Sequence, residues 1–301
     1  MVTGRINGRK QKEDNRMPKI GVQMMMLKQP IERLGPYATL QSVADIGFGS
    51  VEVSQIPMTP EVVNEIARAR DDLGVQIAAI SATVTEQPGV NEPLDTRFDK
   101  IVADCHTLQT RSIRIGMMPH DAMRSAQALT NFCAMADEQA RRLADEGIQL
   151  YYHNHHIEFA KRGGVYILDH IREQAPNLRF EIDVHWVQRG GEHPQSVLKN
   201  YAGLVDLVHL KDYRIGDLPE EAFDAVARGD QETWQAAWTN VVEFGEVGEG
   251  NLDWRDIIDT AIASGAEHLL IEQDRQYGRD PLECLTISYH NLLELGYGNL
   301  M

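Results

Sequence analysis

The segment RFEIDVHW, residues 179–186, decides the fold. Side chains alternate across a strand, so Glu181, Asp183 and His185 are expected on one face and apolar residues on the other. A row of ionisable side chains is costly to bury unless the charges are paired or bind a metal. Glu181 could be paired with an arginine or lysine, whereas Asp183, at the end of the strand, is the better candidate for a metal ligand.

Seven further segments resemble this one in being short, apolar and strand-like, and they alternate with helical patterns from Lys19 onward. This alternation predicts βα units and a parallel sheet. Two helices are expected at residues 60–74 and 121–147, the second ending at Gly147. The eight strands are expected near residues 20–24, 50–54, 75–81, 112–116, 148–154, 179–184, 204–210 and 268–273.

The polar residues of these units favour a closed barrel over an open, doubly wound sheet. They gather at the C-terminal ends of the fifth to eighth strands, where α/β barrels build their sites, and no GxGxxG turn follows any strand. We therefore predict an α/β fold of the (β/α)₈ TIM-barrel type, with one domain over residues 19–301. Residues 1–18 are expected to be a poorly ordered extension.

One long interruption of the barrel pattern is expected at residues 213–251. The stretch is acidic, too long for an ordinary connection, and expected to be a partly helical lid or wall over the barrel mouth. Trp234 and Trp238 are four residues apart, so they would share a helix face and pack together, on the barrel rim or against another subunit. A purely structural excursion is the alternative.

Composition excludes several classes of partner. The formal net charge of -16 would repel a nucleic-acid backbone. No run approaches about 18 uncharged apolar residues, so no membrane span is expected. The cysteines, Cys105, Cys133 and Cys284, are odd in number and far apart, which indicates neither disulfides nor a cysteine metal site. A cytoplasmic protein is expected, and a homo-oligomer is left open.

Four acid or histidine side chains lie at or near the ends of successive strand-like segments, and they predict a site for one divalent metal. They are Glu158 in YYHNHHIEF, Asp183, His209 in LVDLVHLKD and Glu272 in HLLIEQD. Each has a structural alternative. Glu158 could cap a helix, His209 could be a hydrogen-bonded core residue, and Glu272 could pair with Arg275.

Three further side chains near these positions are candidates for catalysis. His153 or His155 could carry a proton or contact the substrate, because a neutral imidazole beside a hard cation suits acid–base work. Lys211 shares a strand face with His209 and could polarise a carbonyl or phosphate oxygen. Its alternative is a salt bridge to Asp212 or Asp183.

With these residues assembled, the chain resembles the xylose-isomerase-like TIM-barrel family of sugar phosphate isomerases and epimerases, which includes ketose 3-epimerases, inosose dehydratases and 3-keto-sugar lyases. The resemblance runs from about Lys19 to the C-terminus. It rests on YHNHHIEF at 152–159, EIDVHWVQRGG at 181–191, VHLKD at 208–212, GEGNLDW at 248–254 and IEQD at 271–274.

The resemblance implies one Mn²⁺, Co²⁺, Mg²⁺ or similar ion on Asp183, His209 and Glu272, with Mn²⁺ favoured and Zn²⁺ also allowed. Many members carry the first ligand, a glutamate, on the fifth strand, where this chain has Tyr152 and His153. Either Glu158 reaches in or His153 substitutes. His185, Trp186, Arg214, Gln273 and Glu249 are candidates for contact with the substrate.

The function implied is a sugar or polyol isomerase or epimerase. A carbonyl and adjacent hydroxyl that chelate the metal would acidify the α-proton through a metal-stabilised enediolate, and a carboxylate (Glu158 or Glu272) or imidazole would remove that proton. The same residues could serve a lyase of the inosose-dehydratase or 3-keto-glycoside type. A metal- or sugar-binding protein without turnover is the third alternative. The expected partner is a small carbohydrate, without nucleic acid or membrane.

Overall fold

The computed structural model describes residues 17–301, so residues 1–16 of the expected extension lie outside the described part. Eight parallel strands close into a barrel in the order β1-β12-β9-β8-β5-β4-β3-β2, and this confirms the predicted (β/α)₈ fold. Each predicted strand is present within a few residues of its expected bounds. They are β1 (Lys19–Gln23), β2 (Ser50–Val53), β3 (Gln76–Ala82), β4 (Ser112–Ile115), β5 (Gln149–His153), β8 (Arg179–Asp183), β9 (Val205–Leu210) and β12 (His268–Ile271).

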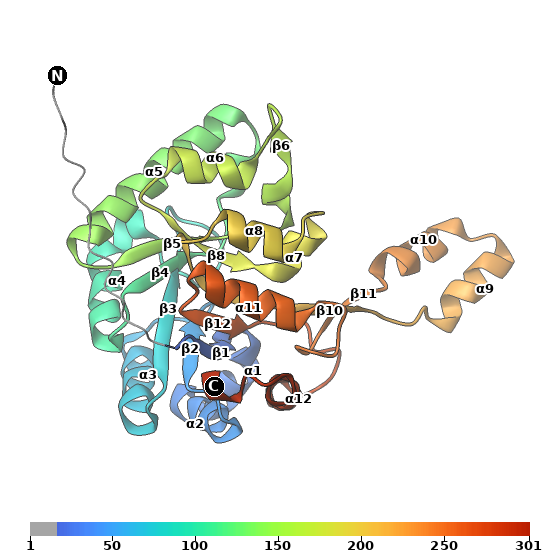
Figure 1. Ribbon diagram of the computed structural model, residues 1–301, viewed down its shortest axis with the longest axis horizontal. Coiled ribbons are helices and arrows are strands. Elements are labelled where there is room, and N and C mark those ends of the chain that lie inside the picture. The colour runs from blue at the N-terminus through green and yellow to red at the C-terminus, as the bar shows by residue number, and fades with distance from the viewer. Residues whose placement is uncertain (1–16) are drawn as a thin grey trace.

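Helices surround the barrel (Figure 1), and the main apolar core lies between them and the outward faces of the strands. None of the described helices is long and apolar enough to cross a membrane. The helices around the barrel are α1 (Lys28–Leu34), α2 (Pro36–Ile46), α3 (Pro60–Leu73), α4 (Leu94–Leu108), α5 (Ala126–Asp145), α6 (Ile167–Gln174), α7 (Val184–Arg189), α8 (Pro194–Asn200), α11 (Trp254–Ser264) and α12 (Pro281–Leu295).

The two helices predicted individually begin and end at residues that explain their bounds. In α3, the Thr59 side chain accepts a hydrogen bond from the Val62 amide, and Gly74 ends the helix in the left-handed conformation. The predicted helix at 121–147 is shorter in the structure. Ser125 caps α5, so the preceding turn forms a separate 3₁₀ helix, His120–Met123.

The interior of the barrel has two different layers. Near the N-terminal ends of the strands it is filled by a small cluster of Ala79, Tyr151 and Leu207. Toward the C-terminal ends it is filled by ionisable side chains, because strand alternation continues from Leu207 to His209 and Lys211. The register pairs Asp183 of β8 with His209 of β9. The barrel thus delivers the polar residues to one end.

The interruption at 213–251 forms an arm, which we define as residues 212–245. Strand β10 (Asp212–Ile215) pairs antiparallel with β11 (Val242–Gly245), and between them lie α9 (Glu220–Arg228) and α10 (Gln231–Asn240). The two helices pack on each other and extend outward from the barrel (Figure 1), rather than lying on its rim as a lid. The pairing of β10 with β11 directs the two helices away from the barrel. The length and acidic composition of the segment do not indicate this direction.

Asp212 fixes the loop that follows the arm. Its buried carboxylate accepts hydrogen bonds from the Trp254 indole at 2.6 Å and from the amides of Gly248 and Gly250, each at 3.1 Å. A Cβ at Gly250 would collide with this carboxylate. Gly250 of GEGNLDW therefore lets its backbone amide approach Asp212.

We expect Asp212→Ala to lower the free energy of unfolding by about 3–5 kcal/mol, because it leaves the buried Trp254 indole N–H and several partly buried backbone amides without an acceptor. For a chain of this size the melting temperature should fall by roughly 10 °C, as measured by thermal denaturation. Asp253→Ala is the matched control. It removes only the cap of α11, where Asp253 accepts from Asp256, and should cost about 1 kcal/mol. Equal losses in the two variants would contradict the role of Asp212.

Candidate metal centre and active-site pocket

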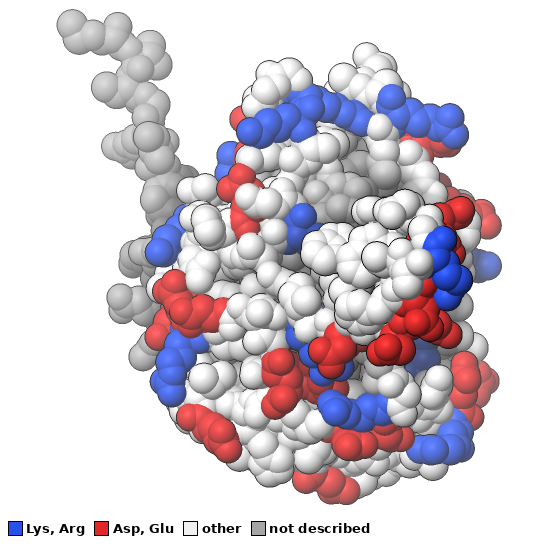
Figure 2. Space-filling view, turned by 90° about the vertical axis from the view of Figure 1, so that its right-hand side faces the viewer, with Lys and Arg blue, Asp and Glu red and all other residues white. Residues whose placement is uncertain are grey.

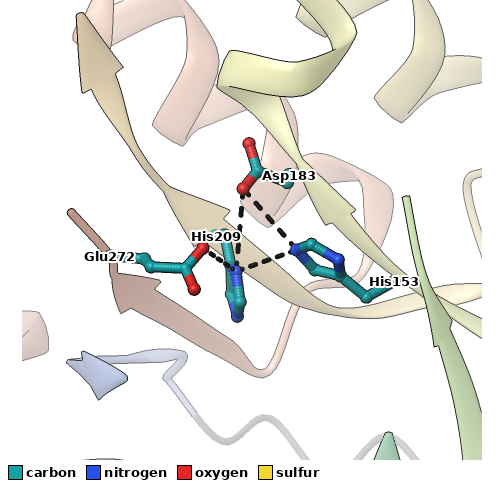
Figure 3. Close-up of side chains that lie close together, drawn as sticks. All are labelled: His153, Asp183, His209 and Glu272. Atoms are coloured by element: carbon teal, nitrogen blue, oxygen red, sulfur yellow. Dashed lines mark hydrogen bonds and ion pairs between the residues drawn. The ribbon is translucent and has the colours of Figure 1, made fainter. Parts of the chain in front are cut away.

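Four buried side chains from four neighbouring strands of the barrel converge at its C-terminal end: His153, Asp183, His209 and Glu272 (Figure 3). One ligand atom from each lies within 4.8 Å of the others. His209 Nδ1 is 2.9 Å from Glu272 Oε2 and 3.1 Å from His153 Nε2. Asp183 Oδ2 is 3.5 Å from His153 Nε2 and 3.8 Å from His209 Nδ1.

The outer partners of the two histidines determine where their protons lie. His153 Nδ1 is 3.2 Å from the carbonyl of Gly116, which can only accept a hydrogen bond, so Nδ1 carries the proton and Nε2 offers its lone pair to the cluster. Likewise, His209 Nε2 donates to Glu52 Oε2 at 3.2 Å, which leaves Nδ1 as the inward acceptor.

The cluster therefore consists of four acceptors that face one another. Asp183 Oδ2 is buried without a hydrogen-bond partner among the described residues. In the absence of a cation, the four atoms are compatible only if a proton lies among them. Burial alone would lower the pKa of His209, but Glu181, Glu272 and Glu52 raise it well above its usual value. Two imidazole nitrogens and two carboxylates fit a divalent ion such as Mn²⁺, Co²⁺, Zn²⁺ or Mg²⁺.

A second layer of charge lies directly beneath the cluster. Arg114 Nε donates to Glu52 Oε1 at 2.7 Å and lies 3.4 Å from Glu181 Oε2. Burial and the neighbouring Glu52 raise the pKa of Glu181 to about 8. Glu181 is thus beside an arginine, as its structural alternative predicted. Sequence reasoning missed Glu52 and Arg114, although each is a lone charged residue inside a short apolar strand, in SVEV and SIRI.

Buried negative charge exceeds buried positive charge at this end of the barrel. The carboxylates of Glu52, Glu181, Asp183 and Glu272 are each at most 5% exposed, as are the two permanent cations, Arg114 and Lys211. Unpaired buried charge is costly, so the excess must be met by protons or by a cation. The excess is one charge while Glu181 keeps its proton, as its raised pKa favours, and two charges when Glu181 is ionised. A divalent cation at the cluster would balance the second case.

Glu158, favoured as the first ligand, does not lie in the cluster. Strand β5 ends at His153, and the chain then turns into a 3₁₀ helix, His156–Phe159. Glu158 is fully buried there, where it accepts from the Tyr152 hydroxyl at 2.7 Å and from the His155 amide at 2.8 Å. It is therefore a capping residue, and the structure brings His153 to the cluster in its place.

His155 and Lys211 lie beside the cluster. The His155 ring packs edge-to-face on His153, its Nδ1 has no hydrogen-bond partner among the described residues, and burial lowers its pKa to about 3. Lys211 Nζ is 2.6 Å from Asp274 Oδ1 and 3.1 Å from Glu272 Oε2. Burial opposes the charge of Lys211, but the carboxylates raise its pKa above the usual value.

These residues form one wall of a cavity of about 590 Å³. The opposite wall comes from the loops after β1 to β4, and its residues include Met25, Lys28, Ile31, Gln55, Ile56, Thr83, Gln87, Val90 and Asn91. Gln55 has a left-handed backbone (φ 54°), which is uncommon for a residue other than glycine. Its side chain accepts from Lys28 Nζ at 2.5 Å. The two walls come from different strands of the barrel.

None of the five predicted substrate-contact residues is among those lining the cavity. His185 and Trp186 belong to α7 and form an aromatic cluster with Tyr213 and Phe244 of the arm. Both His185 nitrogens, the Trp186 indole nitrogen and the Gln273 amide nitrogen are buried without a partner among the described residues. Arg214 pairs with Glu243 and Glu246, and Glu249 accepts from Asn291.

Solved structures with the same fold include several proteins of low sequence identity. A sugar phosphate isomerase/epimerase from Parabacteroides distasonis has a TM-score of 0.69 at 18% identity, over 95% of this chain and 96% of that chain. An L-ribulose 3-epimerase has a TM-score of 0.64 at 16% identity, over 94% and 96%. A xylose isomerase-like TIM barrel protein from Mycobacterium smegmatis, in complex with magnesium, has a TM-score of 0.60 at 15% identity, over 95% and 98%.

A search of curated protein sequences finds no match to the chain. The sequence profile of one family does match, and it spans residues 40–286, which include all four side chains of the cluster. The resemblance inferred from the motifs is thereby confirmed. The chain belongs to the xylose isomerase-like TIM barrel family.

Proposed function

We propose that the protein is a divalent-metal-dependent enzyme that isomerises or epimerises a sugar or polyol by removing an α-proton. The observation that supports this proposal best is the convergence of four inward-facing acceptor atoms beside an open cavity. The buried, unpaired cysteines are compatible with a cytoplasmic location.

His153, Asp183, His209 and Glu272 would hold the ion, and Glu52 would fix the ring of His209. A divalent cation there would stabilise the negative charge that develops on substrate oxygens during enolisation. We favour Mn²⁺ because mixed imidazole and carboxylate sites suit ions of intermediate softness.

His155 is the residue that we assign to proton transfer. It lines the cavity, and its Nδ1 has no hydrogen-bond partner among the described residues, so the ring is free to exchange a proton with a bound substrate. Glu158 holds the backbone of His155 and thereby sets the direction of the ring. Glu272 is the alternative base, although Gln23, His209 and Lys211 all contact its carboxylate and stabilise its charged form.

Lys211 is assigned to charge stabilisation and orientation of the substrate. It lines the cavity as a buried cation, and its Nζ lies 4.8 Å from the ring of Trp186 and 5.2 Å from that of Phe244. Aromatic faces and carboxylates together fix the ammonium group in one place. A substrate oxygen that becomes negative beside it would be stabilised without reorganisation of the protein.

A lyase acting on a keto-glycoside or an inosose is the second candidate. The cavity spans the barrel mouth, with a volume of about 590 Å³, and volumes of this order hold ligands of drug size. A sugar that carries a second group would therefore fit. Elimination begins with removal of the same α-proton.

We expect the metal-loaded protein to incorporate solvent deuterium when it is incubated with ketoses in D₂O. Proton abstraction and return exchange the α-hydrogen, and NMR or mass spectrometry of the recovered sugar would detect the label. Release of water or of an aglycone from inososes or 3-keto-glucosides would instead identify a lyase. Saturable sugar binding with neither outcome would contradict an enzymatic role.

We expect Asp183→Asn and Glu272→Gln to lose metal and activity together, because each removes one of the charged ligands. Metal content by mass spectrometry and titration with Mn²⁺ would measure the loss. His153→Gln and Glu158→Gln provide a matched comparison. The geometry predicts that His153→Gln loses metal and that Glu158→Gln keeps it. Full occupancy in either carboxylate variant would refute the ligand set.

We expect His155→Asn to retain its metal and to lower kcat by about 10²- to 10⁴-fold, the usual range for loss of a general acid or base. His156→Asn is the control, since His156 is the exposed neighbour of His155 and does not line the cavity. An unchanged rate for His155→Asn at saturating substrate would assign proton transfer to Glu272 instead.

A further inference from the structure

The arm, residues 212–245, has little of its own to stabilise it. Helices α9 and α10 are nine and ten residues long and pack on each other. Of their side chains, only Ala222 and Ala225 are buried. Helices this short are marginal in water unless a tertiary surface covers their apolar face. The two helices of the arm would therefore be stabilised by packing against another surface.

Large apolar side chains are exposed on this arm. Phe223, Val226 and Trp238 are 52%, 47% and 57% exposed, and Ile215 is 58% exposed. Trp234 joins them, with its ring 5.7 Å from that of Trp238 and 6.3 Å from that of Phe223. A contiguous aromatic group of this kind marks an interaction site. Trp234 and Trp238 do pack together, as their spacing predicted.

The charge of the arm restricts what can cover it. Residues 217–241 contain six acidic side chains and a single basic one, Arg228. An anionic membrane or a nucleic acid would be repelled by this surface. The partner chemistry that fits is a protein surface with exposed cations around apolar side chains.

The mouth of the barrel offers such a surface. Lys161 of β6 (Lys161–Arg162) and Arg189 at the end of α7 are exposed, and no carboxylate among residues 17–301 forms an ion pair with either. Lys161 lies over the ring of Tyr166 and Arg189 over that of Trp186. Val165 of β7 (Val165–Tyr166), which pairs with β6, is 37% exposed.

The arm and this basic surface lie at the same end of the molecule. Both follow C-terminal ends of barrel strands, β9 for the arm and β5 and β8 for the cations. Figure 2 looks onto that end, and it shows Lys and Arg side chains in a row along the upper edge. The β10–β11 pairing and the contacts of Asp212 hold the base of the arm in its outward direction.

We propose that the arm docks on the barrel mouth of a second copy of this chain, with the acidic, aromatic face of α9 and α10 against the surface around Lys161 and Arg189. A two-fold axis would make the exchange reciprocal, so that each arm lies over the mouth of the partner. The proposal stands on the exposed side chains and their charges, and it does not depend on the reaction catalysed.

Sedimentation velocity over a range of protein concentrations tests the proposal. We expect a dimer for the unaltered chain. The double variant Phe223→Ser with Trp238→Ser should raise the dimer dissociation constant at least about tenfold, which corresponds to about 1.4 kcal/mol. Met135→Ser is the matched control, because Met135 is 42% exposed on α5 at another face, and it should remain dimeric.

Charge reversal identifies the two surfaces. Glu221→Lys with Asp224→Lys on the arm, and separately Lys161→Glu with Arg189→Glu on the rim, should each weaken the dimer. When the two double variants are mixed, each reversed surface meets a complementary one, so a heterodimer should form with at least about tenfold higher affinity than either homodimer.

Three outcomes would overturn the proposal. The first is a monomer at every concentration. The second is a dimer that survives replacement of residues 216–242 by a Gly/Ser linker, since its interface would then lie elsewhere. The third is a mixture of the two charge variants that stays monomeric. Unchanged melting temperatures of the point variants would show that any dissociation is not a consequence of unfolding.

Discussion

The candidate site depends on the imidazole of His209, because both of its ring nitrogens have polar partners. His209 directs Nδ1 to His153, Asp183 and Glu272, and directs Nε2 to Glu52. The carboxylate on the far side fixes the tautomer and thereby makes the near side an acceptor. Arg114 in turn fixes Glu52. The centre can therefore be understood only together with the layer beneath it, because the lower charges determine the protonation of the upper ones.

The backbone fold could be predicted from the sequence because its signals are local. Strand alternation, helix caps and the count of eight βα units each depend on short segments, and the strand ends fall close to their predicted positions. The direction of the arm was not predictable, since it follows from the pairing of β10 with β11 across a long separation in sequence. A helix that packs on the barrel rim and a helix that extends into solvent can have the same amphipathic sequence pattern, so the pattern does not distinguish the two positions.

The candidate site could be predicted only in part. Asp183, His209 and Glu272, which the structure brings together, were predicted because each stands at or near the end of an apolar strand. Glu158 was misplaced because the turn after His153 is a 3₁₀ helix, which a pattern of alternation does not reveal. Glu52 and Arg114 were missed because a single charge inside a strand resembles an ordinary edge residue until its partner across the barrel is known.

The cavity has one wall from the ends of β5, β9 and β12, which carries the candidate metal ligands, and one from the loops after β1 to β4, which carries Met25, Lys28, Ile56 and Gln87 among others. Arg114 of β4 also lines it. The two walls share no residue, and loops tolerate replacement better than strands do. Selection, or a protein engineer, could therefore change which molecule is accepted while leaving the chemistry intact. Related proteins could in this way accept different substrates while they keep the same reactive centre.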